Sequence, residues 1–392
     1  MSSQYEGNPD NYPDDYTIPD DADPATAAAF NVAAEALGDR TAWLKAHVNA
    51  LLPALNWRAN VVGSQHYRAA HYSKPLRRWF AVGDVENVRR SEDGGASWDA
   101  TSMVETEGAN ENCCSIDGDN TGTIVVATKT RYAFTIEFAG GSVSRTKVDV
   151  YGSAITPAHA CVVYDPYHSK WVWFIADGSI VAVKHSSDGL SWTLGAGPPA
   201  STWGGASTHA APVLGCNRSN GRIVAIAKGS GTENGVATSD NGGASFTVRA
   251  SVHDTAITRD TFARSLHYSE EDGLWILALG GVYDNVLSGK ILVSSDGGVT
   301  WTQRWSSTNR TIWSVKTLGK RWYALAMSPT SQDLVFSDDA GVTWRFTGIR
   351  PAIESPIFCE LAVGDGQLAI AGPSGRILTS FRVGTPDLGV FT

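Results

Sequence analysis

One short segment recurs along this 392-residue chain and constrains its fold more than any other feature. Residues 91–98 read SEDGGASW, residues 294–301 read SSDGGVTW and residues 337–344 read SDDAGVTW. Residues 186–192 are one residue shorter, and residues 239–246 carry Asn for Asp and Phe for Trp. An Asp that accepts backbone N–H bonds, a Gly with positive φ and a Ser or Thr hydroxyl favour a tight turn between strands. The repeat predicts a β-protein assembled from copies of one strand–turn–strand unit.

The defining turn positions are expected to be structural. They are Asp93, Trp98, Asp188, Trp192, Asn241, Phe246, Asp296, Trp301, Asp339 and Trp344. The pattern S-x-D-x-G-x-[ST]-W resembles the Asp-box, or bacterial neuraminidase (BNR), repeat of the sialidase-like superfamily. In that family the box joins the third and fourth strands of a propeller blade. The resemblance implies an all-β propeller over residues 54–392.

The spacing of the repeats predicts seven blades. The first two boxes lie about twice as far apart as later neighbours, so a blade without a box is expected between them. Three strand-like runs also follow the last box, without a box of their own, at 357–363, 367–371 and 376–381. The run 57–62 resembles the strand that follows each box Trp. We expect it to complete the last blade and close the ring.

The acidity of the chain is concentrated at its N-terminus. The formal net charge is −9, yet seven acids lie in the first 23 residues, which contain no Lys or Arg. Residues 1–24 are therefore predicted to form an acidic, Pro-rich extended arm. The remainder is nearly neutral and has no basic cluster, which excludes a nucleic-acid-binding footprint. No segment is apolar enough for membrane insertion, and five Cys without a CxxC favour neither a metal site nor a cofactor.

One helix is predicted over residues 25–53, with Asp23 as N-cap and Pro24 at its first position. Phe30 begins a seven-residue apolar repeat that continues through Leu37, Leu44 and Leu51. This spacing indicates a coiled coil and a homo-oligomer, for which we favour a trimer. The alternative is a single amphipathic helix that packs on its own propeller.

The N-terminal segment also resembles the attachment segments of phage and prophage tail proteins. The resemblance covers about 30 residues and implies that residues 1–53 bind other tail or particle proteins. The first residues show neither a basic n-region nor an apolar h-region, so no signal peptide is expected. Synthesis in the cytoplasm and a final location in a virion or an extracellular tail-like particle are expected.

Ligands of propellers usually bind where the innermost strands begin, around one mouth of the central channel. The phase of the repeat predicts seven residues there: Tyr67, Arg68, His159, His209, Arg264, Arg310 and Glu354. Three of them are arginines, which can grip a carboxylate with paired hydrogen bonds. Trp203 and Trp313 are candidates for stacking on sugar faces.

The sialidase resemblance implies an arginine triad, a Tyr nucleophile with its Glu, and an Asp acid/base. Residues 67–70 read YRAA and match the first half of the family's [FY]-R-[IV]-P motif, while Arg264 and Arg310 are candidates to complete the triad. The last inner strand, residues 357–360, offers no Tyr, so no catalytic residue is assigned. A general glycosidase would need two convergent carboxylates. The candidates are Glu354, Asp260, Asp84 and Asp165.

Three functions follow from these patterns. The favoured one is a structural or receptor-binding component of a phage tail or tail-like particle, whose propeller recognises a surface glycan or protein. One alternative is a sialidase-like glycoside hydrolase that acts on acidic sugars. The other alternative is an intracellular scaffold propeller.

Overall fold

The computed structural model describes residues 4–6, 15–17, 57–99, 112–139, 142–152, 159–177, 180–198, 212–228, 234–252, 262–283, 286–328, 331–347 and 360–380. The chain divides into two units, residues 1–56 and residues 57–392. In the first unit, β1 (Gln4–Glu6) pairs antiparallel with β2 (Asp15–Thr17) inside the predicted acidic arm. The predicted helix and coiled coil over residues 25–53 lie outside the described residues.

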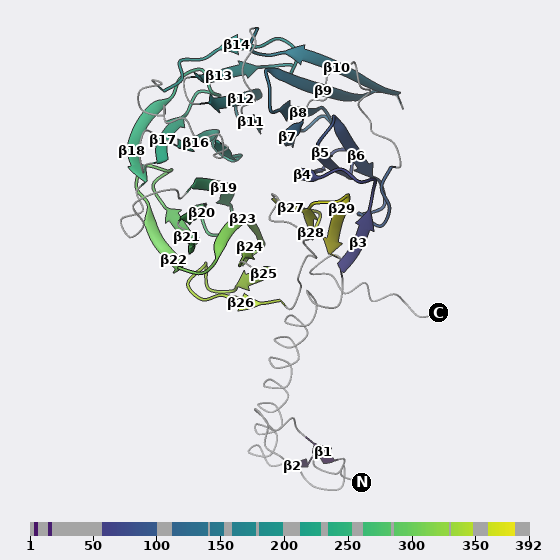
Figure 1. The fold of residues 1–392 in the computed structure, drawn as a ribbon, viewed down its shortest axis with the longest axis vertical. Coiled ribbons are helices and arrows are strands. Elements are labelled where there is room, and N and C mark those ends of the chain that lie inside the picture. Colours follow the sequence, from purple (N-terminus) through teal and green to yellow (C-terminus); the bar gives the residue numbers. More distant parts are fainter. Residues whose placement is uncertain are drawn as a thin grey trace, which may run out of the picture. The chain divides into compact units, whose positions relative to one another are not determined.

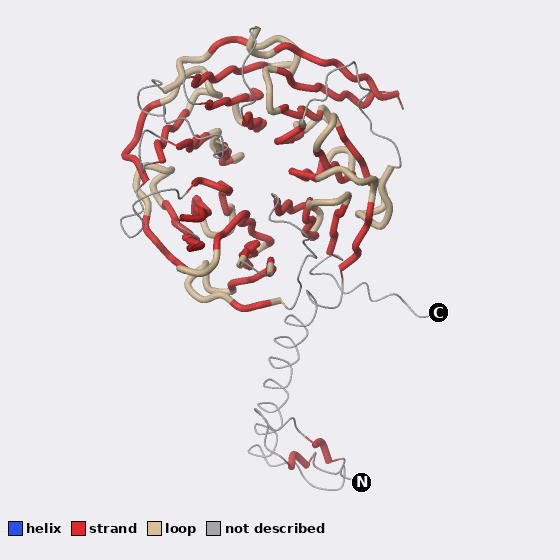
Figure 2. Tube along the Cα trace, in the orientation of Figure 1, coloured by secondary structure: helices blue, strands red, loops and turns tan. Residues whose placement is uncertain are grey.

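The second unit is a ring of seven antiparallel sheets, each of them a blade, around a central axis (Figure 1). Figure 2 shows strands and loops, and no helix, among the residues described in this unit. This arrangement confirms the predicted all-β, seven-bladed propeller. Successive innermost strands contact one another around the ring. These are β4 (Tyr67–Ser73), β7 (Cys113–Gly118), β11 (His159–Asp165), β15 (Val213–Asn217), β19 (Phe262–Ser269), β23 (Thr311–Leu318) and β27 (Glu360–Gly364).

The remaining strands follow outward in chain order. The second strands are β5 (Arg78–Gly83), β8 (Ile124–Thr128), β12 (Lys170–Asp177), β16 (Arg222–Lys228), β20 (Leu274–Tyr283), β24 (Arg321–Met327) and β28 (Gln367–Ala371). The third strands are β6 (Asn87–Ser91), β9 (Tyr132–Ala139), β13 (Ile180–Ser186), β17 (Asn234–Ser239), β21 (Val286–Ser294), β25 (Gln332–Ser337) and β29 (Arg376–Ser380). The described outer strands are β10 (Ser142–Asp149), β14 (Thr193–Leu194), β18 (Thr247–Val252), β22 (Thr302–Ser307), β26 (Arg345–Phe346) and β3 (Trp57–Val61).

The seventh blade closes the ring with strands from both ends of the propeller. β3 is its outer strand and pairs antiparallel with β29, with Ala59 opposite Leu378. The backbone N–H of Tyr67 donates to the Gly372 carbonyl at 2.9 Å, so the start of the first blade is also fastened to the last. The predicted closure by the run 57–62 is confirmed over Trp57–Val61.

The apolar core lies between neighbouring blades. One cluster joins Val125 of β8 to Trp171 and Trp173 of β12, and the next joins Phe174 of β12 to Ile223 of β16. The tryptophans of the second strands are fully buried there. Since each blade presents both of its faces to a neighbour, no single blade can bury its apolar residues alone.

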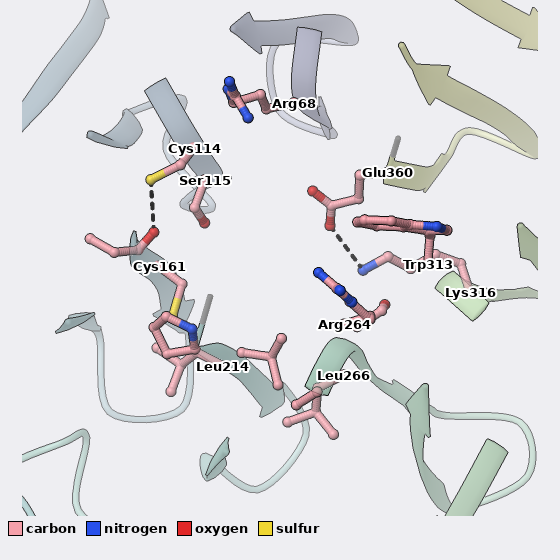
Figure 3. A pocket seen from close by; sticks show the side chains of 15 residues that line it. Arg68, Cys114, Ser115, Cys161, Leu214, Arg264, Leu266, Trp313, Lys316 and Glu360 are labelled. Atoms are coloured by element: carbon pink, nitrogen blue, oxygen red, sulfur yellow. Dashed lines mark hydrogen bonds and ion pairs between the residues drawn. The ribbon is translucent and has the colours of Figure 1, made fainter. Parts of the chain in front are cut away.

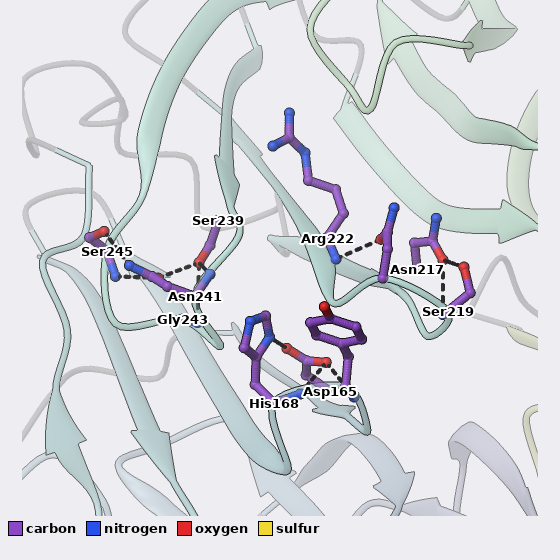
Figure 4. Close-up of polar contacts among 11 residues, drawn as sticks. Asp165, His168, Asn217, Ser219, Arg222, Ser239, Asn241, Gly243 and Ser245 are labelled. Carbon is purple, nitrogen blue, oxygen red and sulfur yellow. Dashed lines mark hydrogen bonds and ion pairs between the residues drawn. The ribbon is translucent and has the colours of Figure 1, made fainter.

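The repeated turn follows the third strand of five blades and is held by its own side chains. In the sixth blade the Thr343 hydroxyl donates to Asp339 Oδ2 at 2.6 Å, and the Thr343 N–H donates to Oδ1 at 2.8 Å. The Ser337 hydroxyl donates to the same Oδ1 at 2.7 Å. In the fourth blade, Asn241 preserves this geometry by accepting from the Ser245 N–H and donating to the Ser245 hydroxyl (Figure 4).

The turn also fastens the blade that carries it to the blade before it. Gly243 has a φ of +82°, and a Cβ at this position would lie 2.7 Å from a methyl of Val172 in the third blade. Glycine is therefore required both by the backbone conformation and by the close approach. In the first blade the equivalent Gly95 carbonyl accepts a hydrogen bond from the Thr379 hydroxyl of the seventh blade at 2.9 Å.

The hydrogen bonds of the Asp339 turn predict a pH-dependent contribution to stability. The Thr343 hydroxyl and N–H lower the pKa of Asp339 from 3.8 to about 2. A lowered pKa stabilises the fold above the unfolded-state value and loses that effect as pH falls through the folded-state value. We expect Asp339→Ala to cost about 1 kcal/mol at neutral pH, because this turn is exposed. Asp339→Asn should cost less, since Asn241 already serves such a turn.

Denaturant unfolding of the wild type and both variants at pH 7, 4 and 2 provides the measurement. The wild type should lose its advantage over Asp339→Asn between about pH 4 and pH 2. A constant difference over this range would contradict the assigned role of the carboxylate.

Because β3 closes the ring, we expect the stability of an N-terminally truncated chain to depend on whether it retains β3. A chain that starts at residue 54 retains β3, whereas one that starts at residue 64 leaves the β29 edge without its partner strand. Calorimetry should find the melting temperature of the shorter chain lowered by about 10 °C or more, and that of the longer chain close to the wild type. Equal melting temperatures for the two truncated chains would show that β3 does not secure the ring.

Candidate ligand-binding channel

Two adjoining cavities occupy the centre of the propeller. The smaller, of about 150 Å³, lies where the innermost strands begin, which is the predicted mouth (Figure 3). The larger, of about 830 Å³, extends to the turns that follow the innermost strands. Both are lined by Ser115, Leu214, Leu266, Lys316 and Glu360. These shared residues make the two cavities parts of one channel.

Four β-bulges supply side chains to the smaller cavity. In β4 the pairing register shifts between Tyr67 and Ala69, and in β7 it shifts between Cys113 and Ser115. The same shift occurs near the start of β19 and of β23. The residues skipped by the four registers are Arg68, Cys114, Arg264 and Trp313, and all four line the cavity. A bulge adds one residue to a strand and redirects its side chain, a device common beside functional sites.

Two contacts orient Arg264 in the smaller cavity. Its Nε donates to the Gly280 carbonyl at 3.1 Å, and its Cζ lies 4.2 Å from the centroid of the Trp313 ring. Burial lowers the pKa of Arg264 to about 10, so the guanidinium remains charged at neutral pH. A cation removed from bulk water in this way interacts strongly with an anion that reaches it.

The other two cations of the cavity have carboxylate partners. Arg68 pairs with Asp84, and both side chains are largely buried. Lys316 Nζ lies 3.7 Å from Glu360 Oε1, across the gap between β23 and β27. Burial raises the pKa of Glu360, and the nearby Lys316 partly opposes this shift. Glu360 is the one carboxylate among the described residues that line the smaller cavity.

The thiols of the cavity are unreactive. Cys114 Sγ donates to the Ala160 carbonyl at 2.9 Å, and burial raises the pKa of Cys114 to about 11. Burial also raises the pKa of Cys161. Because the thiolate is the nucleophilic form, neither residue is suited to attack a substrate at neutral pH. Cys359 lies outside the described residues.

The larger cavity contains a polar network centred on Asp117. Arg218 Nη2 donates to both oxygens of Asp117 at 2.6 and 2.8 Å, and the Tyr164 N–H donates to Oδ2 at 2.7 Å. His71 Nδ1 lies 3.2 Å from Oδ1. Burial lowers the pKa of His71 to about 4 and that of His267, on β19, to about 3. Both imidazoles are therefore neutral at physiological pH.

The predicted mouth residues are only partly brought together. Arg68 and Arg264 line the same cavity. Tyr67 is fully buried instead, and its hydroxyl donates to the Val62 carbonyl at 2.8 Å. Arg310 turns away to pair with the buried Asp333 at 2.6 Å. The side chain of His159, together with His209 and Glu354, lies outside the described residues, as does Trp203.

The candidate carboxylates do not form a catalytic pair in the part of the chain that the structure describes. Asp84 pairs with Arg68, and the fully buried Asp165 accepts from the backbone N–H of Tyr167 and contacts His168 Nδ1 (Figure 4). Asp260 and Glu354 lie outside the described residues. No group of three or more His, Cys, Asp or Glu side chains that could hold a metal ion is found among the residues described. No described helix is long and apolar enough to cross a membrane.

The sequence analysis missed Lys316, Glu360 and the whole Asp117 network as channel residues. The structure places Trp313, a candidate for stacking on sugar faces, on β23 in the channel wall. One signal was available, because Lys316 and Glu360 are charged residues in otherwise apolar or small inner strands. A charge at such a position must find a partner or line a polar cavity.

Comparison with solved structures relates the chain to other propellers. YCF48 bound to a D1 peptide superposes with a TM-score of 0.58 at 13% identity, over 85% of this chain and 96% of that one. YCF48 from Cyanidioschyzon merolae gives a TM-score of 0.55 at 14% identity, over 83% of this chain and 98% of that one. The GH74 enzyme of Niastella koreensis gives 0.53 at 15% identity, over 83% of this chain but only 44% of the enzyme.

No protein-family model and no curated protein matches the chain. At identities this low, the structural likeness concerns the fold and not the ligand. What this chain shares with YCF48 and with the GH74 enzyme is therefore the β-propeller architecture.

Proposed function

We propose that this protein is the receptor-binding component of a phage tail or tail-like particle, and that its propeller binds an acidic surface glycan without cleaving it. The observation that carries the proposal is the convergence of Arg68, Arg264 and Lys316 on one cavity that contains a single described carboxylate. The particle context is supported by the resemblance of the N-terminal segment to tail attachment regions. The resemblance of the repeated turn to the Asp-box supports placement in the sialidase-like superfamily.

The chemistry of the cavity suits a sugar carboxylate. The guanidinium of Arg264 is held by Gly280 and by the Trp313 ring, so little side-chain entropy is lost when an anion binds. Guanidinium groups bind carboxylates with paired, charge-assisted hydrogen bonds. The indole and the apolar side chains of Leu214 and Leu266 offer surface to the non-polar face of a sugar ring.

The number of carboxylates in the smaller cavity favours binding over hydrolysis. Glycosidases generally use two carboxyl groups about 5 to 10 Å apart, one of them an acid with a raised pKa. Glu360 has a raised pKa but has no second carboxylate beside it in the described lining of the smaller cavity. YCF48, a propeller of this fold, has been solved bound to a D1 peptide, so a propeller of this architecture can serve as a recognition module.

The first test compares Arg264 variants for glycan binding. Wild-type protein should bind 3′-sialyllactose or a glucuronate-terminated oligosaccharide in preference to lactose. Arg264→Gln should weaken this binding about 10- to 100-fold, because the oriented guanidinium is lost. Arg264→Lys should recover only part of it, since an ammonium cannot form the paired contact. Isothermal titration measures each affinity.

Arg145→Gln is the matched control. Arg145 lies exposed on the outer strand β10, so this variant removes the same charge far from the channel. If Arg145→Gln and Arg264→Gln lost the same affinity for the glycan, the effect of Arg264→Gln would be explained by net charge alone. Release of free sialic acid or free glucuronate by the wild type would replace the binding proposal with a hydrolase.

The particle proposal is tested separately with the chain that starts at residue 54. Its propeller should bind the acidic glycan as the full chain does, but it should no longer co-sediment with particles, because residues 1–53 are proposed to attach it. Sedimentation of particles assembled with either chain, followed by immunoblotting, gives the result. If the truncated chain were incorporated into particles normally, residues 1–53 would not be the attachment segment.

A further inference from the structure

We propose that Glu360 is an internal competitor for the anionic ligand: its carboxylate occupies Lys316 when no ligand is bound, and a ligand carboxylate displaces it. This inference rests on the proposed function, because it concerns the same cavity. It assigns to one carboxylate the control of affinity at a site that otherwise attracts anions.

The position of Glu360 carries the argument. It is the first residue of β27, it lines both cavities, and it faces Lys316 of β23 at 3.7 Å (Figure 3). In the same view Arg264 and Trp313 lie beside this pair, on the same side of the cavity. A ligand anion that reaches Arg264 therefore approaches the Glu360 carboxylate, and two like charges in one low-dielectric cavity repel each other.

The Lys316 ammonium group can pair closely with the Glu360 carboxylate or with a ligand carboxylate, but not equally well with both. Its side chain is 19% exposed, so the direction of its ammonium group is restricted by the channel wall. When a ligand carboxylate takes this ammonium, Glu360 must either move away or bind a proton. The Glu360 side chain is 37% exposed, which leaves it room to move, and partial desolvation raises its pKa, which favours protonation.

The groups around Glu360 leave it as the titrating residue. On the packed neighbours β4 and β23, the charged or titratable residues in the channel wall are Arg68, His71, Tyr72 and Lys316. The packed strand β28 carries no charged residue, and on β24 Arg321 pairs with Asp338 and hydrogen-bonds Tyr323. The other charged or titratable residues of the described lining are Lys74, Cys114, Asp117, Asp119, Cys161, Cys216, Arg218, Arg264, His267, Tyr268, Glu270, Glu271 and Asp365.

The imidazoles and thiols among these neighbours do not change charge between about pH 7 and pH 5. The pKa values of His71 and His267 are lowered to about 4 and about 3, and those of the three thiols are raised. Glu360 is the carboxylate of the smaller cavity among the described residues, and its pKa is raised, so we assign to it the proton that the site takes up as pH falls.

The sign of the pH dependence follows from linkage. A bound anion favours protonated Glu360, so binding takes up a proton and strengthens as pH falls toward the pKa of Glu360. The ligand carboxylate of a sialic or uronic acid is more acidic and stays charged over this range. Affinity should therefore rise from pH 7 to pH 5 in the wild type.

The experiment measures binding of 3′-sialyllactose and of free glucuronate to the wild type and to Glu360→Gln, by isothermal titration at pH 7, 6 and 5. We expect Glu360→Gln to bind about tenfold more tightly at pH 7 and to show no rise toward pH 5. Glu270→Gln is the matched control, since it removes a carboxylate from the other mouth of the channel. Its affinity and pH dependence should equal those of the wild type, and thermal melts establish that each variant is folded.

A second pair of variants isolates the role of Lys316. In a Lys316→Gln background the tenfold gain from Glu360→Gln should largely disappear, because the ammonium for which the two anions compete is gone. An undiminished gain would overturn the competition. So would weaker or equal binding by Glu360→Gln in the wild-type background, which would make Glu360 an acceptor of ligand hydroxyls or a bystander.

The outcomes separate this inference from the proposed function. Loss of binding in Arg264→Gln together with weaker binding in Glu360→Gln would overturn the competition and keep the acidic-glycan site. Binding by Glu360→Gln but not by the wild type at any pH would support the competition and reject glycan recognition by the native protein. Absence of binding in both proteins would overturn both proposals.

Discussion

The closure of the ring is the constraint on which the rest of this structure depends. Every cluster of the apolar core is shared between neighbouring blades, so a blade that lacks a neighbour exposes one of its faces. The pairing of β3 with β29 joins the two ends of the propeller sequence in one sheet and removes the open edge. The repeated turns add to this closure, because each brings a glycine against the preceding blade or accepts a hydrogen bond from it.

Closure also creates the channel. Seven innermost strands approach the axis, and their side chains set its charge. Among the described residues, the end where these strands begin is lined by three basic residues and one acidic residue, whereas the opposite end is lined by three basic and six acidic ones. The two ends share Lys316 and Glu360. The ion pair between β23 and β27 thus stands where the sign of the lining charge changes, so charge on either residue affects both ends.

The fold was predictable because its signal repeats. The Asp or Asn, Gly and hydroxyl positions of the turn recur in five copies, the double interval between the first two copies indicated a blade without a box, and the run 57–62 matched the missing outer strand of the last blade. The site was predictable only in part. The phase of the repeat predicts equivalent places for Arg264 and Arg310. The structure places Arg264 at the third position of β19 but Arg310 just before β23, so the residue of β23 that corresponds to the bulged Arg264 is Trp313. A register shift of one residue decides which side chain faces the channel, and sequence alone does not reveal it.

Tyr67 and Arg68 show the same limit within one dipeptide, since the first is buried in the blade and the second lines the channel. The second mouth was missed for another reason. Some of its residues, such as Arg218 and Glu270, lie on turns between first and second strands, and a single sequence does not distinguish a turn that connects strands from a turn that lines a cavity. Others are brought together only by the fold: Asp117, near the end of β7, contacts Arg218 from 101 positions away in the chain.

The four bulges allow the residues that line the channel to vary independently of the residues that hold the fold together. A bulged residue has no register partner in the neighbouring strand, so its side chain can change while the ladder on either side keeps its hydrogen bonds. Arginine, cysteine and tryptophan already occupy this place in different blades of one ring. A propeller built in this way can acquire a new recognition chemistry by substitutions at four positions, with little effect on the closure that keeps it folded.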